Sequence, residues 1–264
     1  MNARAALVTG GARRLGRAMA LRLADRGAAV AVHFATSRKA GAETVDQIRE
    51  AGGEAVAVEA DLLDEVACSQ LVERAAECLG RPLDVLVNNA SIFEHDTLAS
   101  ASEDSWQRHM MSNFRAPFIL IQGFARQAPE PVPVPERHGE LTARATIINL
   151  VDQRVLKPTP QFMTYTLAKL GLWNLTGLAA RALAPGIRVN AIGPGPTLQG
   201  HRQSDDHFRK QRAATPLERG AGAEDVVTAM DFLLDSPSVT GQLICPDGGQ
   251  HLAWQTPDAL VGRG

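Results

Sequence analysis

The strongest constraint on the fold of this sequence is the regular alternation of short apolar runs with longer amphipathic segments. Seven runs are rich in β-branched and other apolar residues, and they span residues 5–9, 28–34, 54–60, 84–89, 145–151, 187–192 and 241–245. Strands that are apolar on both faces are typical of a parallel sheet covered by helices on two sides. We therefore predict an α/β fold, with a single doubly wound domain over residues 1–264 and a parallel sheet of about seven strands.

Composition and charge exclude several classes of protein. The formal net charge is −2, which gives no bulk attraction to nucleic acid or to an anionic membrane. We find no apolar run of about 18 residues and no secretory pattern near the N-terminus, so we expect a cytoplasmic protein. Cys68, Cys78 and Cys245 lack the spacing of a zinc site or a disulfide framework, and we predict no metal.

Two segments interrupt the alternation. Residues 127–144 contain four prolines, which excludes a helix interior or a central strand, and we expect a polyproline-like surface loop. A ligand for a proline-recognition module is the alternative. Residues 197–220 are polar and follow a Gly/Pro cluster, at a place where a substrate lid is often found. The alternative there is a surface helix.

A glycine-rich turn follows the first predicted strand. Gly10 and Gly11 allow a tight turn, and Gly16 allows a close approach of the next helix. The amide groups at such a helix start suit a pyrophosphate. Arg14 stands where a middle glycine is expected, and its guanidinium is placed to donate to a phosphate or to a substrate.

The end of the second predicted strand selects the nucleotide. An acidic residue there binds a ribose 2′-hydroxyl and repels a 2′-phosphate. Residues 32–39 contain no acid and offer Thr36, Ser37, Arg38 and Lys39 instead. This favours NADPH over NADH. The alternative is a solvated helix start capped by Ser37.

Tyr165 is the only tyrosine of the chain, and Lys169 follows it by one helical turn. Both side chains therefore lie on one face of a helix and can point at one ligand. A nearby ammonium lowers the pKa of a phenol from its ordinary value of about 10, which improves proton transfer near neutrality. The alternative is a packing role for a partly buried tyrosine.

Taken together and in order, six motifs resemble the short-chain dehydrogenase/reductase family over residues 5–253. They are TG-x5-G at 9–16, ADL at 60–62, NNAS at 88–91, YTLAK at 165–169, NAIGPGPT at 190–197 and DGG at 247–249. The resemblance implies a Rossmann-like fold, a nicotinamide cofactor and an oligomer, for which we expect a homotetramer. It also implies a set of cofactor contacts: Gly10, Arg14, Leu15, Gly16, Ser37, Arg38, Asp61, Leu62, Asn88, Ala90, Tyr165, Lys169, Pro194, Gly195 and Thr197.

The resemblance further assigns roles to single residues. Asp61 is expected to meet the adenine, and Asn88 to stabilise its strand and the cofactor. Asn113 is expected to organise a proton-relay water, and Lys169 to hold the nicotinamide ribose.

The sequence departs from the family at the position thirteen residues before Tyr165. The family pattern has a serine there, whereas this chain has Asp152. A serine donates a hydrogen bond to a substrate carbonyl, but an ionised aspartate cannot donate and repels a developing alkoxide. Asp152 therefore counts against simple ketone reduction, and it suits a nitrogen heterocycle with amino substituents.

This departure resembles the pteridine reductase branch of the family. In that branch an aspartate replaces the serine, an arginine occupies the glycine turn, and a phenylalanine stacks on the pterin; Asp152, Arg14 and Phe93 match. Ser91 is a further expected pterin or cofactor contact, and a core position is the alternative for Phe93.

We therefore predict an NADPH-dependent reductase of pterin-like substrates, such as a dihydropterin, biopterin or dihydrofolate. Hydride would reach a C=N bond, with the proton supplied by Tyr165 and Asp152. One alternative is a carbonyl reductase of a sugar, an oxoacyl compound or another ketone. Another is a nucleotide-sensing protein without turnover, against which the set of Asn113, Tyr165 and Lys169 counts.

Overall fold

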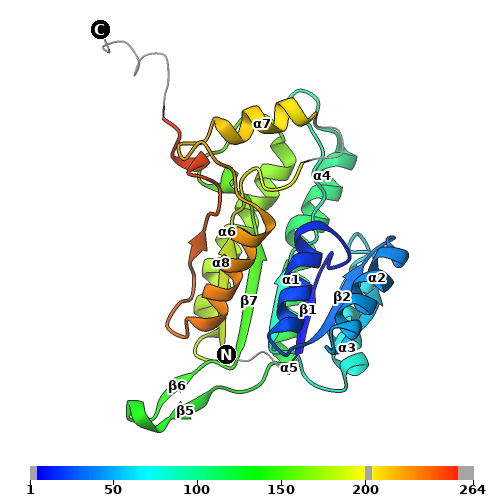
Figure 1. Cartoon of the computed structure of the whole chain (residues 1–264), viewed down its shortest axis with the longest axis vertical. Coiled ribbons are helices and arrows are strands. Elements are labelled where there is room, and N and C mark those ends of the chain that lie inside the picture. The colour runs from blue at the N-terminus through cyan, green and yellow to red at the C-terminus, as the bar shows by residue number, and fades with distance from the viewer. Residues whose placement is uncertain (1–4, 200–203, 255–264) are drawn as a thin grey trace.

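The computed structural model describes residues 5–199 and 204–254, and a seven-stranded parallel sheet forms its centre (Figure 1). The strand order is β3-β2-β1-β4-β7-β8-β9. The strands are β1 (Ala5–Val8), β2 (Ala29–Phe34), β3 (Ala55–Glu59), β4 (Val85–Asn88), β7 (Ala145–Leu150), β8 (Ile187–Ile192) and β9 (Leu243–Ile244). The predicted doubly wound sheet of about seven strands is confirmed.

Helices cover both faces of the sheet. They are α1 (Arg14–Asp25), α2 (Arg38–Glu50), α3 (Glu65–Leu79), α4 (Glu103–Met110), α5 (Ala116–Gln127), α6 (Met163–Leu183), α7 (Asp205–Ala213) and α8 (Ala223–Asp235). Successive side chains of a strand point to opposite faces. Thus Ala5 and Leu7 of β1 pack with α3, α5 and α6, while Ala6 and Val8 pack with α1, α2 and α8. Two buried cores therefore hold the sheet between two helical layers.

The strand order reverses between β1 and β4. From β1 the chain builds outward through β2 and β3, then returns to place β4 on the other side of β1. In open α/β sheets a ligand binds at this reversal, outside the carboxyl ends of the strands. The loops after β1 and β4 contain the glycine turn and the Asn-Asn-Ala-Ser motif, so both motifs lie at one edge.

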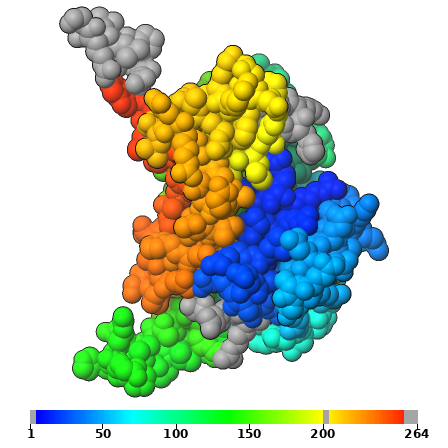
Figure 2. Space-filling model, in the orientation of Figure 1, coloured from blue at the N-terminus to red at the C-terminus, as the bar shows by residue number. Residues whose placement is uncertain are grey.

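The proline-rich segment differs from the prediction of a polyproline-like loop. It forms a hairpin of β5 (Val132–Val134) and β6 (Glu140–Thr142), which projects from the body of the protein (Figures 1 and 2). Pro133 is tolerated because the hairpin is a separate two-stranded sheet with free edges. His138 and Gly139 reverse the chain with φ of 56° and 80°.

The segment predicted as a lid contains α7, which lies at the carboxyl-end side of the sheet (Figure 1). Ser204 is the N-cap of this helix, and its hydroxyl accepts a hydrogen bond from the His207 amide at 3.3 Å. Phe208 and Gln211 of α7 line the cleft described below. Residues 200–203 lie outside the described residues, and closure of the segment stays a prediction. No helix in the described ranges is long and apolar enough to cross a membrane.

Candidate active site

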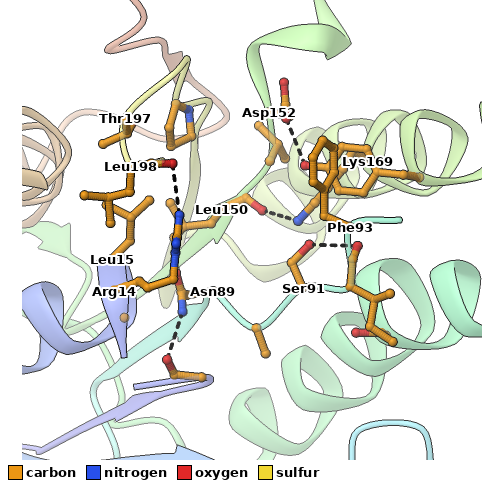
Figure 3. A pocket seen from close by; sticks show the side chains of 18 of the residues that line it. Arg14, Leu15, Asn89, Ser91, Phe93, Leu150, Asp152, Lys169, Thr197 and Leu198 are labelled. Atoms are coloured by element: carbon orange, nitrogen blue, oxygen red, sulfur yellow. Dashed lines mark hydrogen bonds between the residues drawn. The ribbon is translucent and has the colours of Figure 1, made fainter. Parts of the chain in front are cut away.

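A cleft of about 810 Å³ opens at the carboxyl ends of the strands, at the point where the strand order reverses between β1 and β4. The glycine turn and residues Arg14, Thr197 and Leu198 form one side, and Phe93, Asp152 and Lys169 form the other (Figure 3). The cleft gathers most of the predicted site residues: Gly10, Arg14, Leu15, Gly16, Asp61, Leu62, Ala90, Ser91, Phe93, Asp152, Tyr165, Lys169, Pro194, Gly195 and Thr197. Ser37, Arg38, Asn88 and Asn113 do not line it.

The glycine turn is shaped to let a ligand approach the backbone. Gly10 has φ of +62°, a left-handed conformation that favours glycine. A Cβ on Gly16 would lie 2.1 Å from the Gly10 carbonyl oxygen, so α1 can pass this close only with glycine there. Asn89 Nδ2 donates to the Thr9 carbonyl oxygen at 2.8 Å and ties the turn to the end of β4. Asn89 was not among the residues predicted from the sequence, although it belongs to the Asn-Asn-Ala-Ser motif.

Arg14 takes the backbone conformation of the glycine that it replaces. Its φ is +52°, which costs a non-glycine residue about 1–2 kcal/mol. Its guanidinium donates to the carbonyl oxygens of Leu198 at 3.0 Å and Gln199 at 2.8 Å. These two bonds hold the strained turn and join it to the start of the segment that contains α7.

At the far end of the cleft, the structure does not bring Ser37 and Arg38 to the lining. The Arg38 side chain is 80% exposed and forms an ion pair with Glu59, at the end of β3. Ser37 precedes α2 without a side-chain capping bond. Thr36 and Arg13 line the cleft instead. An exposed ion pair contributes little free energy, so Arg38 can exchange Glu59 for an anionic ligand at small cost.

Asp152 and Tyr165 form the polar centre of the cleft. The Tyr165 hydroxyl donates to Asp152 Oδ2 at 2.9 Å. Asp152 Oδ1 accepts from the Arg154 amide at 2.8 Å, because Asp152 caps the 3₁₀ turn Gln153–Val155 that follows β7. The hydrogen bonds from the Arg154 amide and the Tyr165 hydroxyl fix both carboxylate oxygens of Asp152. The carboxyl group is therefore positioned by the turn after β7 and by α6.

Lys169 does not lower the pKa of Tyr165 in this structure, and that prediction is wrong. Burial and the adjacent Asp152 carboxylate raise the pKa of Tyr165 well above its ordinary value. The Lys169 ammonium instead donates to the Leu150 carbonyl oxygen at 2.7 Å, 5.8 Å from the centre of the tyrosine ring. Burial lowers the pKa of Lys169 to about 8 and raises the pKa of Asp152. The phenol is therefore a neutral hydrogen-bond donor, beside a carboxyl group whose pKa is raised by burial.

Asn113 and Asn88 are buried behind the cleft and support its walls. Asn113 lies in the π-helical turn Met111–Arg115, where its side chain accepts from the Ile92 amide at 2.9 Å and donates to the Ile92 carbonyl oxygen at 2.8 Å. Asn88 Nδ2 donates to Asn149 Oδ1 at 2.8 Å and links β4 to β7. Asn113 thereby fixes the loop that contains Ser91 and Phe93, and its role toward a water stays a prediction.

Phe93 is half exposed, with 53% of its surface accessible, which rules out the alternative of a core position. One ring face stacks on Phe162, with centroids 4.4 Å apart and planes 6° apart, and the ring meets Tyr165 edge-on at 4.7 Å. Arg154 covers the Phe162 ring at 4.9 Å. Phe162 and Arg154 were not among the residues predicted from the sequence, although Phe162 stands only three residues before Tyr165.

A buried polar network anchors the loop that contains Phe93. The Thr164 hydroxyl donates to the Asp96 carboxylate, and Thr164 Oγ1 lies 2.7 Å from His109 Nδ1. The Glu94 amide donates to His109 Nε2 at 3.2 Å, so His109 carries its proton on Nδ1. The network joins α4, α6 and the loop, and it limits the movement of Phe93 relative to Tyr165.

Comparison with known proteins extends these observations. The family model described as short chain dehydrogenase matches residues 4–210. The 3-oxoacyl-[acyl-carrier-protein] reductase FabG of Staphylococcus aureus strain Mu50 is 30% identical over 254 residues, which cover 94% of this chain and 98% of that protein.

Solved structures are similar over almost the whole chain. FolM alternative dihydrofolate reductase 1 from Brucella suis, crystallised with NADP, is 40% identical with a TM-score of 0.88; the match covers 97% of this chain and 98% of that chain. A short chain dehydrogenase from Burkholderia cenocepacia, also with NADP, is 32% identical with a TM-score of 0.84, and the match covers 95% and 98%. The predicted cofactor agrees with the nucleotide in both crystals.

Proposed function

The chain belongs to the short-chain dehydrogenase family, and from that premise we propose that it is an NADPH-dependent reductase of pterin-like substrates. The observation that carries the proposal is the Asp152 carboxyl group, hydrogen-bonded to Tyr165 at the position where the family pattern has a serine. An acid there accepts hydrogen bonds from ring N–H and amino groups, which a pterin offers and a simple ketone lacks. The similarity to FolM alternative dihydrofolate reductase supports the same substrate class.

The cleft fits NADPH, which supplies a hydride when bound. The left-handed Gly10 and the missing Cβ of Gly16 leave backbone free for a pyrophosphate at the start of α1. Arg14 would add a charged donor and Asp61 would meet the adenine, and both residues line the cleft. Thr36, Ser37 and Arg38 would meet the 2′-phosphate after Arg38 leaves Glu59, and Pro194, Gly195 and Thr197 would border the nicotinamide.

Proton supply is the task of Tyr165 and Asp152. The neutral phenol donates its proton toward a substrate nitrogen. The protonated form of Asp152, which burial favours by raising the pKa of this carboxyl group, returns a proton to Tyr165 along their shared hydrogen bond, and solvent then reprotonates Asp152. Lys169 would hold the nicotinamide ribose. Phe93 and Ser91 would contact the pterin, with Phe93 offering the ring surface that Phe162 leaves uncovered.

Carbonyl reduction is the second candidate, because FabG reductases are 30% identical over nearly the whole chain. In that case the Asp152 carboxylate would have no catalytic task and would only cap the turn after β7. A nucleotide-sensing protein without turnover is a weaker candidate, since Tyr165 and Lys169 meet in the cleft. The homotetramer and the cytoplasmic location stay predictions, and sedimentation equilibrium tests the former.

Asp152→Ser separates the two enzymatic candidates. In a pterin reductase this substitution removes a charged hydrogen-bonding group worth about 1.5–3 kcal/mol, so pterin kcat/KM should fall roughly 10- to 100-fold. In a ketone reductase the serine restores the usual donor, and activity on ketones should rise. Steady-state NADPH oxidation is measured for both proteins with dihydrobiopterin, dihydrofolate and a ketone panel. The proposal would be disproved if the wild type reduced none of the pterins and folates tested and Asp152→Ser reduced a ketone faster than the wild type does.

A further inference from the structure

A second, smaller cavity adjoins the main cleft on the side of Asp152. Its volume is about 420 Å³, and it shares Gln153, Arg154 and Gln250 with the main cleft. Gln153 and Arg154 follow directly on Asp152 in the turn that this acid caps, and Gln250 comes from the separate 3₁₀ turn Gln250–Leu252. A molecule whose reacting ring lies beside Asp152 and Phe93 can therefore extend into the small cavity.

The lining of the small cavity is polar and positively charged. Arg154 and Lys157 face it with three glutamines, and none of its lining residues is acidic. The Lys157 ammonium donates to the Ala253 carbonyl oxygen at 2.8 Å, and within residues 5–199 and 204–254 it pairs with no carboxylate. The Arg154 guanidinium lies 3.9 Å from Asp152 and donates to the Thr159 hydroxyl. Two cations facing one cavity without an acid in its lining favour an anionic ligand.

Gln153 supplies an independent observation at the junction of the two cavities. Its side chain is more than nine-tenths buried, with 6% of the residue exposed. Its Oε1 atom has no hydrogen-bond partner in the described part of the chain. Buried polar atoms are nearly always paired, because an unpaired one costs about 1–3 kcal/mol. Gln153 belongs to the lining of both cavities and therefore marks where they join.

We propose that the small cavity binds the carboxylate tail of a conjugated pterin, which makes a dihydrofolate-type compound the substrate rather than an unconjugated pterin. This inference rests on the proposed function. The pterin ring occupies the main cleft, the linker passes Gln153 where the cavities join, and the tail carboxylates meet Arg154 and Lys157. An unconjugated pterin with a short neutral side chain leaves the Lys157 ammonium without a carboxylate partner.

The test compares two substrates in wild type and in Lys157→Gln. Wild type should favour dihydrofolate over dihydrobiopterin, and Lys157→Gln should raise the dihydrofolate KM about tenfold with little change in kcat, because Lys157 is remote from the reacting ring. The dihydrobiopterin KM should stay the same. Lys157→Arg keeps the charge and should restore most of the affinity. Arg137→Gln removes a positive charge from the turn of the projecting hairpin and should change neither substrate.

Each outcome bears on a separate claim. If wild type reduces neither substrate, the proposed function fails. If both are reduced and Lys157→Gln changes neither KM, or raises both equally, the tail-binding cavity is wrong while the pterin reductase stands. A phosphate ester of a dihydropterin forms a third arm: dependence on Lys157 for the phosphate ester but not for dihydrofolate would overturn the carboxylate assignment. High salt should weaken dihydrofolate binding and leave dihydrobiopterin unaffected.

Discussion

Replacement of Tyr165 by phenylalanine is the most direct test of the proton supply. The ring stays in place, so the edge-on contact with Phe93 at 4.7 Å is retained. The substitution removes the hydroxyl that donates to Asp152 at 2.9 Å. Asp152 keeps its hydrogen bond from the Arg154 amide, so one carboxylate oxygen remains paired. The change is therefore confined to one proton and one hydrogen bond.

The structure sets the expected magnitudes. A hydrogen bond to a charged group contributes about 1.5–3 kcal/mol, and the partly satisfied carboxylate places the loss near the lower end. We expect a melting temperature lower by roughly 3–6 °C for a domain of this size. Turnover of a dihydropterin should fall about 100-fold or more, because a positioned proton donor contributes a factor of that order. The affinity for NADPH should stay within about twofold.

The assay is NADPH oxidation under saturating pterin, with NADPH binding measured by calorimetry. Thr166→Val is the matched control. It removes a buried hydroxyl from the same helix, and that hydroxyl has no hydrogen-bond partner in the described residues. Turnover of Tyr165→Phe within about threefold of wild type would refute the proton role. The single tyrosine also permits a direct absorbance titration of the phenol in the cofactor-free protein. A phenolate that forms below pH of about 10 would contradict the raised pKa of Tyr165.

Two further predictions concern the cofactor and the buried lysine. Arg38→Asp should reduce the preference for NADPH over NADH by about tenfold, because a carboxylate repels the 2′-phosphate, and the ratio of kcat/KM values measures it; an unchanged ratio would exclude Arg38 as a cofactor contact. Burial lowers the pKa of Lys169 from 10.5 to about 8. The unfolded chain therefore binds more protons between these values, and wild type should gain up to about 3 kcal/mol of stability relative to Lys169→Met as the pH rises through that range. Urea unfolding at pH values on either side of about 8 measures the difference, and a constant difference would contradict the lowered pKa.

The sheet and the set of cleft residues were predictable from the sequence because both depend on local patterns. Apolar runs such as residues 145–151 identify strands that are buried on both faces, and the order of the runs along the chain implies a doubly wound sheet. The glycine turn and the Asn-Asn-Ala-Ser motif directly follow strands, so the topology alone brings them to one edge. Tyr165 and Lys169 share a helix face through their spacing.

Contacts between distant segments could not be predicted in the same way. Arg38 pairs with Glu59, a residue at the end of a different strand, and it does not line the cleft. Phe162 reaches Phe93 because φ of +56° redirects the chain just before α6. The hairpin of β5 and β6 contains two three-residue strands, and the four prolines of this segment argued against strands when only the sequence was considered.

The proton affinity of Tyr165 shows most clearly what the sequence determines and what only the tertiary structure determines. The sequence alone determined that a tyrosine, a lysine and an aspartate occur at the spacings of one catalytic set. Only the tertiary structure decided which charge acts on the phenol. The Asp152 carboxylate lies 2.9 Å from the Tyr165 hydroxyl, while the Lys169 ammonium turns to a backbone carbonyl. Electrostatic effects depend on distance and burial in space, and neither quantity can be read from separation along the chain.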